Sequence, residues 1–391
     1  MANKTISRLY PRLRALCVFR ALLETPLLRA LSDFLQTTDR VDAYSRFVSE
    51  IYSGGGNLTA CVQRLIFENE NVYVKACANG LTVDRHIADS VDRELKTLGE
   101  LAALTPADFT ELLGEIEVAG FASEWIDLAA AYHARVAEIG KFGYGIFASS
   151  GMFRLSDKAE RQIEPILSVD PVTLATFTGY ENERDLVIAN TRAFVAGKPA
   201  ANVLLYGDAG TGKSSTVKAV ANAFFSQGVR LIELRKDQMS MLPFVMECIN
   251  GNPLKFIIFI DDLSFNRNDD SFSMLKAALE GSASAKASNA VIYATSNRRH
   301  IVRECFDDRE GSDVHRNDTM QELLSLSARF GLSIRFEKPD KKLYLQIVHE
   351  LAAKAGVDMP AEQLETEAEA FALRRGHRSA RCAEQFVDSL L

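Results

Sequence analysis

The spacing of apolar residues along the chain changes near residue 165. Before that point, leucines recur at helical intervals over residues 13–35, with one interruption near Pro26. Residues 71–75 alternate between polar and apolar types, which favours a short strand. The remaining apolar stripes have helical spacing, so the pattern predicts a mainly helical domain over residues 1–165.

Beyond residue 165, short apolar runs alternate with helical stretches. The predicted strands are 203–206, 229–234, 256–260, 290–294 and 332–336. The predicted helices between them are 181–196, 213–226, 242–249 and 271–279. This alternation is typical of right-handed βαβ units, so we expect an α/β fold with a parallel sheet over residues 166–337. Helical spacing returns from residue 338 to 391, which predicts a small helical lid after the sheet.

Composition narrows the class of protein without identifying it. The chain has 391 residues, of which 47% are apolar and 25% charged, values typical of a globular protein. The formal net charge of −7 argues against a nucleic-acid coat protein, although a local basic patch remains compatible with it. The six cysteines include no Cys-x-x-Cys pair, so we expect reduced thiols, a cytoplasmic setting and no zinc site.

The N-terminal segment is basic. The first 23 residues carry five basic side chains and no acid, but they lack the apolar core of a secretory signal, which favours an amphipathic helix that packs or docks. No apolar run approaches the roughly 18 residues that a membrane span needs. We therefore expect no membrane span.

A glycine-rich turn between a predicted strand and a predicted helix carries the clearest chemistry. Residues 207–214 fit the pattern G-x-x-x-x-G-K-[ST], in which glycines let the backbone wrap a polyphosphate and its N–H groups point inward. Lys213 would reach the β- and γ-phosphates, and the Ser214 hydroxyl would bind Mg²⁺. The predicted nucleotide-binding residues are Gly207, Asp208, Ala209, Gly210, Thr211, Gly212, Lys213, Ser214 and Ser215.

Two acids end the apolar strand 256–260. Ligands of parallel sheets bind at the carboxyl ends of the strands, so Asp261 and Asp262 would lie near the glycine-rich turn. We expect Asp261 to hold Mg²⁺ and Asp262 to polarise an attacking water. The alternative is that either aspartate caps a helix, which is a common role for this residue.

Three further polar positions follow later in the chain. Asn297 closely follows the strand 290–294 and could contact the γ-phosphate or the lytic water, with Thr295 as the second choice and turn chemistry as the alternative. Arg329 precedes the last strand and could stabilise charge as an arginine finger, or form a surface ion pair. Arg381 or Arg378, three residues apart, could fold over the nucleotide from the lid. Residues 298–300 are basic and could meet phosphate, a neighbouring subunit or solvent.

In this order, the motifs resemble those of AAA+ ATPases, over about residues 170–391. The sequences of five segments resemble more closely a bacterial AAA+ family catalogued as domain of unknown function 815. These segments are 207–219, 259–265, 279–281, 293–300 and 325–332. The resemblance implies a P-loop NTPase core of the ASCE type, ATP with Mg²⁺, and homo-oligomers with shared active sites. The resemblance also implies that Asn297 corresponds to the sensor 1 residue of these ATPases. It likewise implies that Arg329 corresponds to the arginine finger and Arg381 to the sensor 2 arginine.

Two positions depart from the family patterns. Many AAA+ proteins end the acidic strand with Asp-Glu, whereas this chain has Asp261-Asp262, so slow turnover is expected. Ala328 stands where an acid often precedes the finger, which leaves Arg329 itself intact.

Three functions remain open from the sequence. The first is an ATPase that remodels a protein partner held by the N-terminal domain. The second, which is not favoured, is a nucleic-acid-linked ATPase of the helicase-loader or transposition-helper type. The third is a nucleotide-dependent scaffold or switch with little hydrolysis. Residues 236–240 lack an aromatic-apolar-glycine loop, so processive threading of a polypeptide is not expected.

Overall fold

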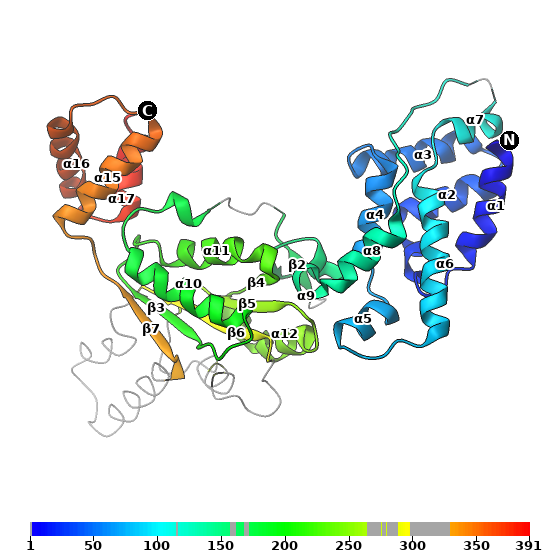
Figure 1. Ribbon diagram of the computed structural model, residues 1–391. Helices are drawn as coiled ribbons and strands as arrows, with labels where there is room; N and C mark the ends of the chain where they lie inside the picture. Colours follow the sequence, from blue (N-terminus) through cyan, green and yellow to red (C-terminus); the bar gives the residue numbers. More distant parts are fainter. Residues whose placement is uncertain are drawn as a thin grey trace. The chain divides into compact units, whose positions relative to one another are not determined.

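A computed structural model describes residues 2–114, 116–156, 162–167, 172–263, 275, 279, 288–297 and 329–391 (Figure 1). The chain forms two compact units, Met1–Ser149 and Ser150–Leu391. The division falls earlier than the expected boundary at residue 165. The reason is that two short strands, β1 (Met152–Leu155) and β2 (Ile163–Pro165), extend the sheet of the second unit.

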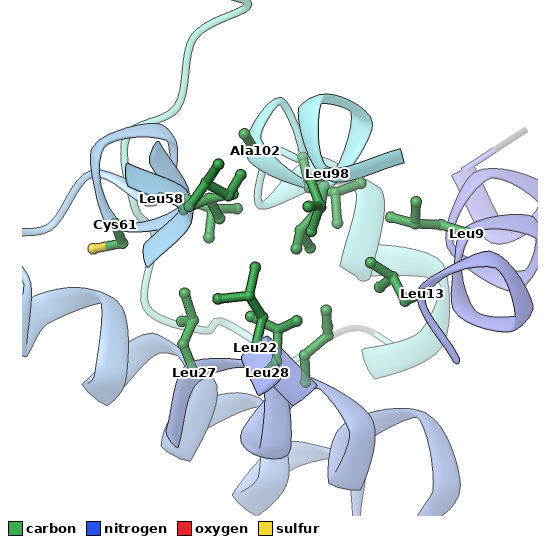
Figure 2. Close-up of a cluster of buried hydrophobic side chains, with 14 of the residues drawn as sticks. Leu9, Leu13, Leu22, Leu27, Leu28, Leu58, Cys61, Leu98 and Ala102 are labelled. Atoms are coloured by element: carbon green, nitrogen blue, oxygen red, sulfur yellow. The ribbon is translucent and has the colours of Figure 1, made fainter. Parts of the chain in front are cut away.

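Helices make up nearly all of the regular secondary structure in the described residues of the first unit, and Asn57 and Ala122 form an isolated β-bridge. Its α-helices are α1 (Ala2–Arg14), α2 (Pro26–Gln36), α3 (Arg40–Ser53), α4 (Leu58–Glu68), α5 (Val72–Ala78), α6 (Arg85–Ala102), α7 (Ala107–Leu113), α8 (Leu128–Ala137) and α9 (Ile139–Phe142). The 3₁₀ helices are η1 (Arg20–Glu24) and η2 (Gly145–Ala148). The helical stripes seen in the sequence are therefore the buried faces of these helices, as Figure 2 shows for leucines from α1, η1, α2, α4 and α6.

The strand predicted at 71–75 is wrong, because this segment begins α5. Asn71 is the N-cap of that helix, and its side-chain oxygen accepts a hydrogen bond from the Val74 N–H at 2.9 Å. An N-cap asparagine satisfies a backbone donor that has no partner within the helix. In such a short segment, this capping outweighs the alternation of polar and apolar residues.

The second unit is built on a seven-stranded sheet. Besides β1 and β2, its strands are β3 (Val203–Gly207), β4 (Val229–Leu234), β5 (Lys255–Ile260), β6 (Ala290–Ser296) and β7 (Leu332–Phe336). The order is β2-β1-β4-β5-β6-β3-β7, and every neighbouring pair is parallel except β1 with β2. The five predicted strands and their parallel pairing are thus confirmed, whereas β1 and β2 were not anticipated.

Helices cover this sheet and bury its strands. Residues at alternate positions, such as Val203 and Leu205 of β3, pack in one cluster with Val187 of α10 (Glu181–Val195) and Val217 of α11 (Lys213–Ala223). Figure 1 shows α10 and α11 running along the sheet. The intervening strand residues, including Leu204, are buried as well. Burial on both faces explains why these strands are apolar without alternation.

Three further segments complete the second unit. The 3₁₀ helix η5 (Lys236–Met241) and α12 (Leu242–Ile249) connect β4 to β5. Of the helix predicted at 271–279, only residues 275 and 279 are described. After β7, the helices α15 (Lys341–Ala355), α16 (Ala361–Arg375) and α17 (Ala380–Asp388) pack around their own apolar cluster. These three helices form the expected lid.

Candidate nucleotide site

The loop after β3 has a backbone that requires glycine. Gly207 has φ +136°, and a Cβ there would lie 2.0 Å from the carbonyl oxygen of Phe336 on the neighbouring strand β7. Gly210 and Gly212 have φ +74° and +87°. Because α11 begins at Lys213, directly after the loop, the first N–H groups of the helix lie at the loop and suit an anion.

Lys213 is a buried cation at the start of α11. Only 4% of the residue is exposed. Its Nζ donates to the carbonyl oxygens of Gly207 at 3.1 Å and Asp208 at 2.6 Å. Burial lowers the pKa of its ammonium, and the carboxylates of Asp208, Asp261 and Asp262 oppose that shift. The ammonium is thus folded back over the loop, where phosphate oxygens could replace the two carbonyls.

Ser214 and Asp261 join the loop to the end of β5. The Ser214 hydroxyl donates to Asp261 Oδ1 at 2.6 Å, and the Thr295 hydroxyl donates to the same oxygen at 2.5 Å. A hydroxyl and one carboxylate are the protein ligands that Mg²⁺ takes in phosphate sites, where waters and phosphate oxygens supply the rest. The described residues include no group of three or more His, Cys, Asp or Glu side chains suited to a metal. The Ser214 hydroxyl and the Asp261 carboxylate, by their chemistry, fit magnesium bound together with a nucleotide.

Asp262 lies beside this pair in an unusual backbone conformation. Its φ is +52°, and its N–H donates to the Thr295 hydroxyl at 3.0 Å. The Asn297 amide donates to Asp262 Oδ1 at 2.9 Å. The parallel register pairs Ile260 of β5 with Ala294 of β6, so the residues that follow both strands meet at one edge of the sheet. Asn297 thus contacts the second acid, and Thr295 contacts both acids.

A cavity of about 450 Å³ opens beside the loop. Its volume is in the range of small-molecule sites, roughly 300–1,000 Å³. The lining residues come from α10 and the segment before it, from the loop and α11, and from the lid helices α15 and α17. They are Val172, Thr176, Phe177, Thr178, Tyr180, Arg184, Gly210, Thr211, Gly212, Ser215, Thr216, Ile347, Leu351, Ala380, Arg381 and Glu384. The mixture of apolar side chains and loop backbone fits a nucleoside adjoining its phosphates.

The lid arginine that borders this cavity is Arg381. Its backbone N–H donates to the carbonyl oxygen of Gly210 at 3.2 Å, which ties the start of α17 to the loop. The Arg378 guanidinium is instead paired with both carboxylate oxygens of Glu369, at 2.8 and 2.6 Å. Of the two arginines considered from the sequence, Arg381 is therefore the one with access to a nucleotide.

Arg329 does not join the other predicted site residues. It precedes β7, whose first residue, Leu332, pairs with Val203 at the start of β3. The glycine-rich loop lies at the opposite end of these strands, five residues or on the order of 16 Å away. The basic residues 298–300 lie outside the described residues.

The remaining loop residues have local roles in the geometry. Asp208 accepts a hydrogen bond from the Lys338 N–H at 3.0 Å, and the Thr211 hydroxyl donates to the Asp208 carbonyl at 2.9 Å. Ala209 lies between these positions, and Ser215 lines the cavity. The loop is therefore fixed both internally and by the strand-to-lid connection.

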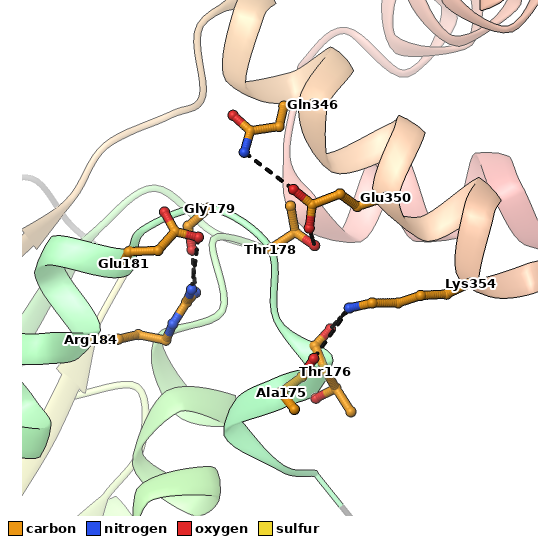
Figure 3. Close-up of polar contacts among 9 residues, drawn as sticks. All are labelled: Ala175, Thr176, Thr178, Gly179, Glu181, Arg184, Gln346, Glu350 and Lys354. Carbon is orange, nitrogen blue, oxygen red and sulfur yellow. Dashed lines mark hydrogen bonds and ion pairs between the residues drawn. The ribbon is translucent and has the colours of Figure 1, made fainter.

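Sequence reasoning missed the wall of the cavity that precedes α10. Thr178 of this wall donates to Glu350 of α15, and Lys354 of α15 reaches the same segment (Figure 3). These residues are about 170 positions apart in the chain and belong to no local motif. A signal was present only in the turn residues around Gly179, which mark where the chain bends before α10.

The sheet and the loop together define the class of protein. β6 lies between the strand that leads into the phosphate loop and the strand that ends in Asp261, as in P-loop NTPases of the ASCE type, and a helical lid follows. The chain therefore has the AAA+ P-loop NTPase fold. A family profile described as "protein of unknown function (DUF815)" matches residues 148–391, more than half of the chain, and the chain belongs to this family.

Comparison with solved structures returned the RuvB Holliday junction branch migration motor of Thermotoga maritima. It is 17% identical, with a TM-score of 0.39, and the match covers 56% of this chain and 64% of that one. A point mutant of the same motor gives 17% identity, a TM-score of 0.40 and the same coverage. The chain thus spans less than two thirds of the length of RuvB. A search of curated proteins found no match.

No helix within the described ranges has both the length and the hydropathy needed to cross a bilayer.

Proposed function

We propose that this protein is an ATPase of the AAA+ type that binds ATP with Mg²⁺ and hydrolyses it slowly. The observation that carries the proposal is one hydrogen-bonded network. Ser214, Asp261 and Thr295 meet within it, and Asp262 and Asn297 adjoin them beside the buried Lys213. Convergent polar groups of this kind, next to a cavity, are the usual form of a binding and catalytic site.

Each residue in the network has a role that its position supports. The loop N–H groups and Lys213 bind the β- and γ-phosphates, and Ser214 with Asp261 holds Mg²⁺. Bound magnesium would neutralise charge on the phosphate oxygens. Asp262 accepts a proton from the attacking water or orients it, while Asn297 fixes the carboxylate. Arg381 adds positive charge from the lid.

The conformation of Asp262 supports slow turnover of ATP and is also compatible with a second candidate function. Its side chain is one methylene shorter than glutamate, and it stands on a left-handed backbone that non-glycine residues rarely adopt. If the carboxylate is held away from the attacking water, it activates that water poorly and ATP hydrolysis is slow. The second candidate is therefore a nucleotide-dependent switch, in which ATP binding rather than turnover changes the affinity for a partner.

The position of Arg329 supports the proposal that the protein forms a homo-oligomer whose active sites are shared between subunits. It lies at the end of the sheet opposite the loop of its own chain, so its guanidinium would serve the nucleotide of a neighbouring copy. An arginine supplied in trans stabilises the charge that develops during phosphoryl transfer.

The helical unit offers a surface for a protein partner. A cavity of about 250 Å³ is bounded by α1, η1 and α2 and is lined by buried Leu13, Leu28 and Leu31 and by exposed Arg14 and Arg20. The Glu24 carboxylate also lines it and is paired with Arg29. Leucines flanked by cations suit an acidic segment that carries a large apolar side chain. We propose that the partner which the ATPase remodels docks here.

The first test replaces the second acid. Asp262→Asn should keep ATP binding and lower turnover at least tenfold, because the water loses its proton acceptor. Turnover is measured by phosphate release and binding by equilibrium dialysis, with the exposed Asp358→Asn as the control. Unchanged hydrolysis would remove Asp262 from the mechanism. Turnover already negligible in the wild type, with intact ATP binding, would favour the switch.

The second test addresses the shared site. Arg329→Ala and Lys213→Ala should each be inactive alone, and mixing them should restore part of the activity. In the mixed oligomer, one interface combines an intact loop with an intact Arg329. Absence of rescue in oligomers whose mixing is verified by native mass spectrometry contradicts action in trans. Affinity capture with the Asp262→Asn form, with and without Arg14→Glu and Arg20→Glu, tests the docking surface.

A further inference from the structure

Residues 172–178, here called the strap, form one wall of the nucleotide cavity. The two ends of the strap are held by the α/β core. At one end, the Asn222 amide of α11 donates to the carbonyl oxygen of Val172 at 3.0 Å. At the other end, the buried Arg184 of α10 donates to the carbonyl oxygen of Gly179, and the Tyr180 hydroxyl donates to that of Glu337 at 2.6 Å.

The middle of the strap is held by the lid. Lys354 Nζ donates to the carbonyl oxygens of Ala175 at 3.2 Å and Thr176 at 3.3 Å. The Thr178 hydroxyl donates to Glu350 Oε2 at 2.8 Å, and Gln346 orients the same carboxylate through Oε1 at 3.2 Å (Figure 3). Glu350 and Lys354 are four residues apart, so one face of α15 makes both contacts.

The same face of α15 also borders the cavity. Ile347 and Leu351, each three positions before one of these polar residues, line it together with Phe177 and Thr178 of the strap. Two walls of the cavity are thus joined by the polar contacts that flank them. Separating α15 from the strap would move apart two surfaces that a nucleoside between them would touch.

We propose that Glu350 and Lys354 act as a latch that joins the strap to the lid and sets how tightly the site holds a nucleotide. The proposal rests on the proposed function, because it assigns positioning residues to the same nucleotide site. Neither side chain needs to contact the nucleotide. Both act by keeping the strap against α15, so the latch affects binding and release more than the chemical step.

The hydrogen bond from Thr178 is the largest cause of a lowered pKa at Glu350, which supports an ionised carboxylate as the acceptor. In each contact one partner carries a charge, which strengthens the hydrogen bond relative to one between two neutral groups. The latch is therefore expected to close at neutral pH.

The test measures ATP and ADP affinity separately from turnover on the full chain. Glu350→Ala, Thr178→Val and Lys354→Met should each raise the Kd of a fluorescent ATP analogue about tenfold, as loss of a charge-assisted hydrogen bond would. The kcat at saturating ATP should stay within about twofold of wild type. Lys342→Met, an exposed lysine of the same helix, is the matched control and should leave the Kd unchanged.

A double mutant separates the latch from a general loss of lid stability. Thr178→Val combined with Glu350→Ala should raise the Kd no more than either single change, because both remove the same hydrogen bond. Additive effects, an unchanged Kd, or a fall in kcat without a change in Kd would each overturn the latch. If Lys213→Ala abolishes binding while the latch variants bind normally, the nucleotide site stands and the latch alone is wrong. If wild type binds no nucleotide, the proposed function fails.

Discussion

The helical unit and the α/β unit both bury charged side chains, but these side chains meet different partners. In the helical unit, the Glu94 carboxylate accepts hydrogen bonds from the backbone N–H groups of Cys17, Val18 and Phe19 at 2.9–3.2 Å. In the α/β unit, the Lys213 ammonium donates to carbonyl oxygens of its own loop. Glu94 completes a turn of the fold, whereas Lys213 lies beside a cavity.

The difference follows from where backbone groups are left without partners. In the helical unit, a tight turn between α1 and η1 exposes several N–H groups, and a carboxylate from α6 satisfies them. In the α/β unit, the carboxyl ends of parallel strands and the start of α11 bring unpaired backbone groups to one edge. Polar residues at that edge can be shared with a ligand. Buried polar groups therefore indicate function only when the surrounding backbone leaves room for a ligand.

The largest expected effect concerns Lys213. Lys213→Ala should lower ATP turnover at least about 100-fold, because the site loses the cation that faces the phosphates. Phosphate release and the thermal shift caused by Mg-ATP measure it, with the exposed Lys198→Ala as the control. An undiminished turnover would mean that the α/β unit, like the helical one, uses its buried charge for structure.

The second effect concerns Glu94. Glu94→Ala should lower the free energy of unfolding of the helical unit by about 3 kcal/mol, because several buried N–H groups lose a charged acceptor. Glu100→Ala, which removes a half-exposed ion pair with Arg12, should cost less than about 1 kcal/mol. Urea unfolding followed by hydrogen exchange of α6 measures both. Equal losses for the two variants would show that Glu94 has no special structural role.

The smallest effect concerns acid and the lid. The hydrogen bond from Arg378 is the largest cause of a lowered pKa at Glu369. A carboxyl whose pKa is lower in the folded chain stabilises the fold fully above its ordinary value of 4.5. That contribution is lost as the pH falls through the lowered value.

The midpoint temperature of thermal unfolding of the full chain should therefore fall more steeply below pH 5.5 in wild type than in Arg378→Gln. Parallel pH profiles for the two proteins would contradict this assignment. The lid would then resemble the surface of the helical unit, where exposed ion pairs contribute little.

Much of the α/β unit was predictable because its signals are local. The strand before Gly207, the helix after Gly212 and the apolar strand before Asp261 each show in a few consecutive residues, and the structure confirms them. Residues 71–75 show the limit of local reading, since Asn71 caps a helix there instead. The strands β1 and β2 are only four and three residues long, too short for a recognisable period.

The sequence by itself determined the phosphate loop, because that chemistry depends on residue types at fixed spacing and on backbone freedom that only glycine provides. It also determined which residues follow the strands, so Asp261, Asp262 and Asn297 could be named in advance. Their roles in hydrolysis stay predictions.

Only the tertiary structure decided which of these residues meet. It brought Thr295 to Asp261, turned Arg381 rather than Arg378 toward the cavity, and put Arg329 at the far end of the sheet. It also joined Thr178 to Glu350 across the cavity wall. Contacts between residues far apart in the chain depend on strand order and helix packing. No single local segment of the sequence determines either of these.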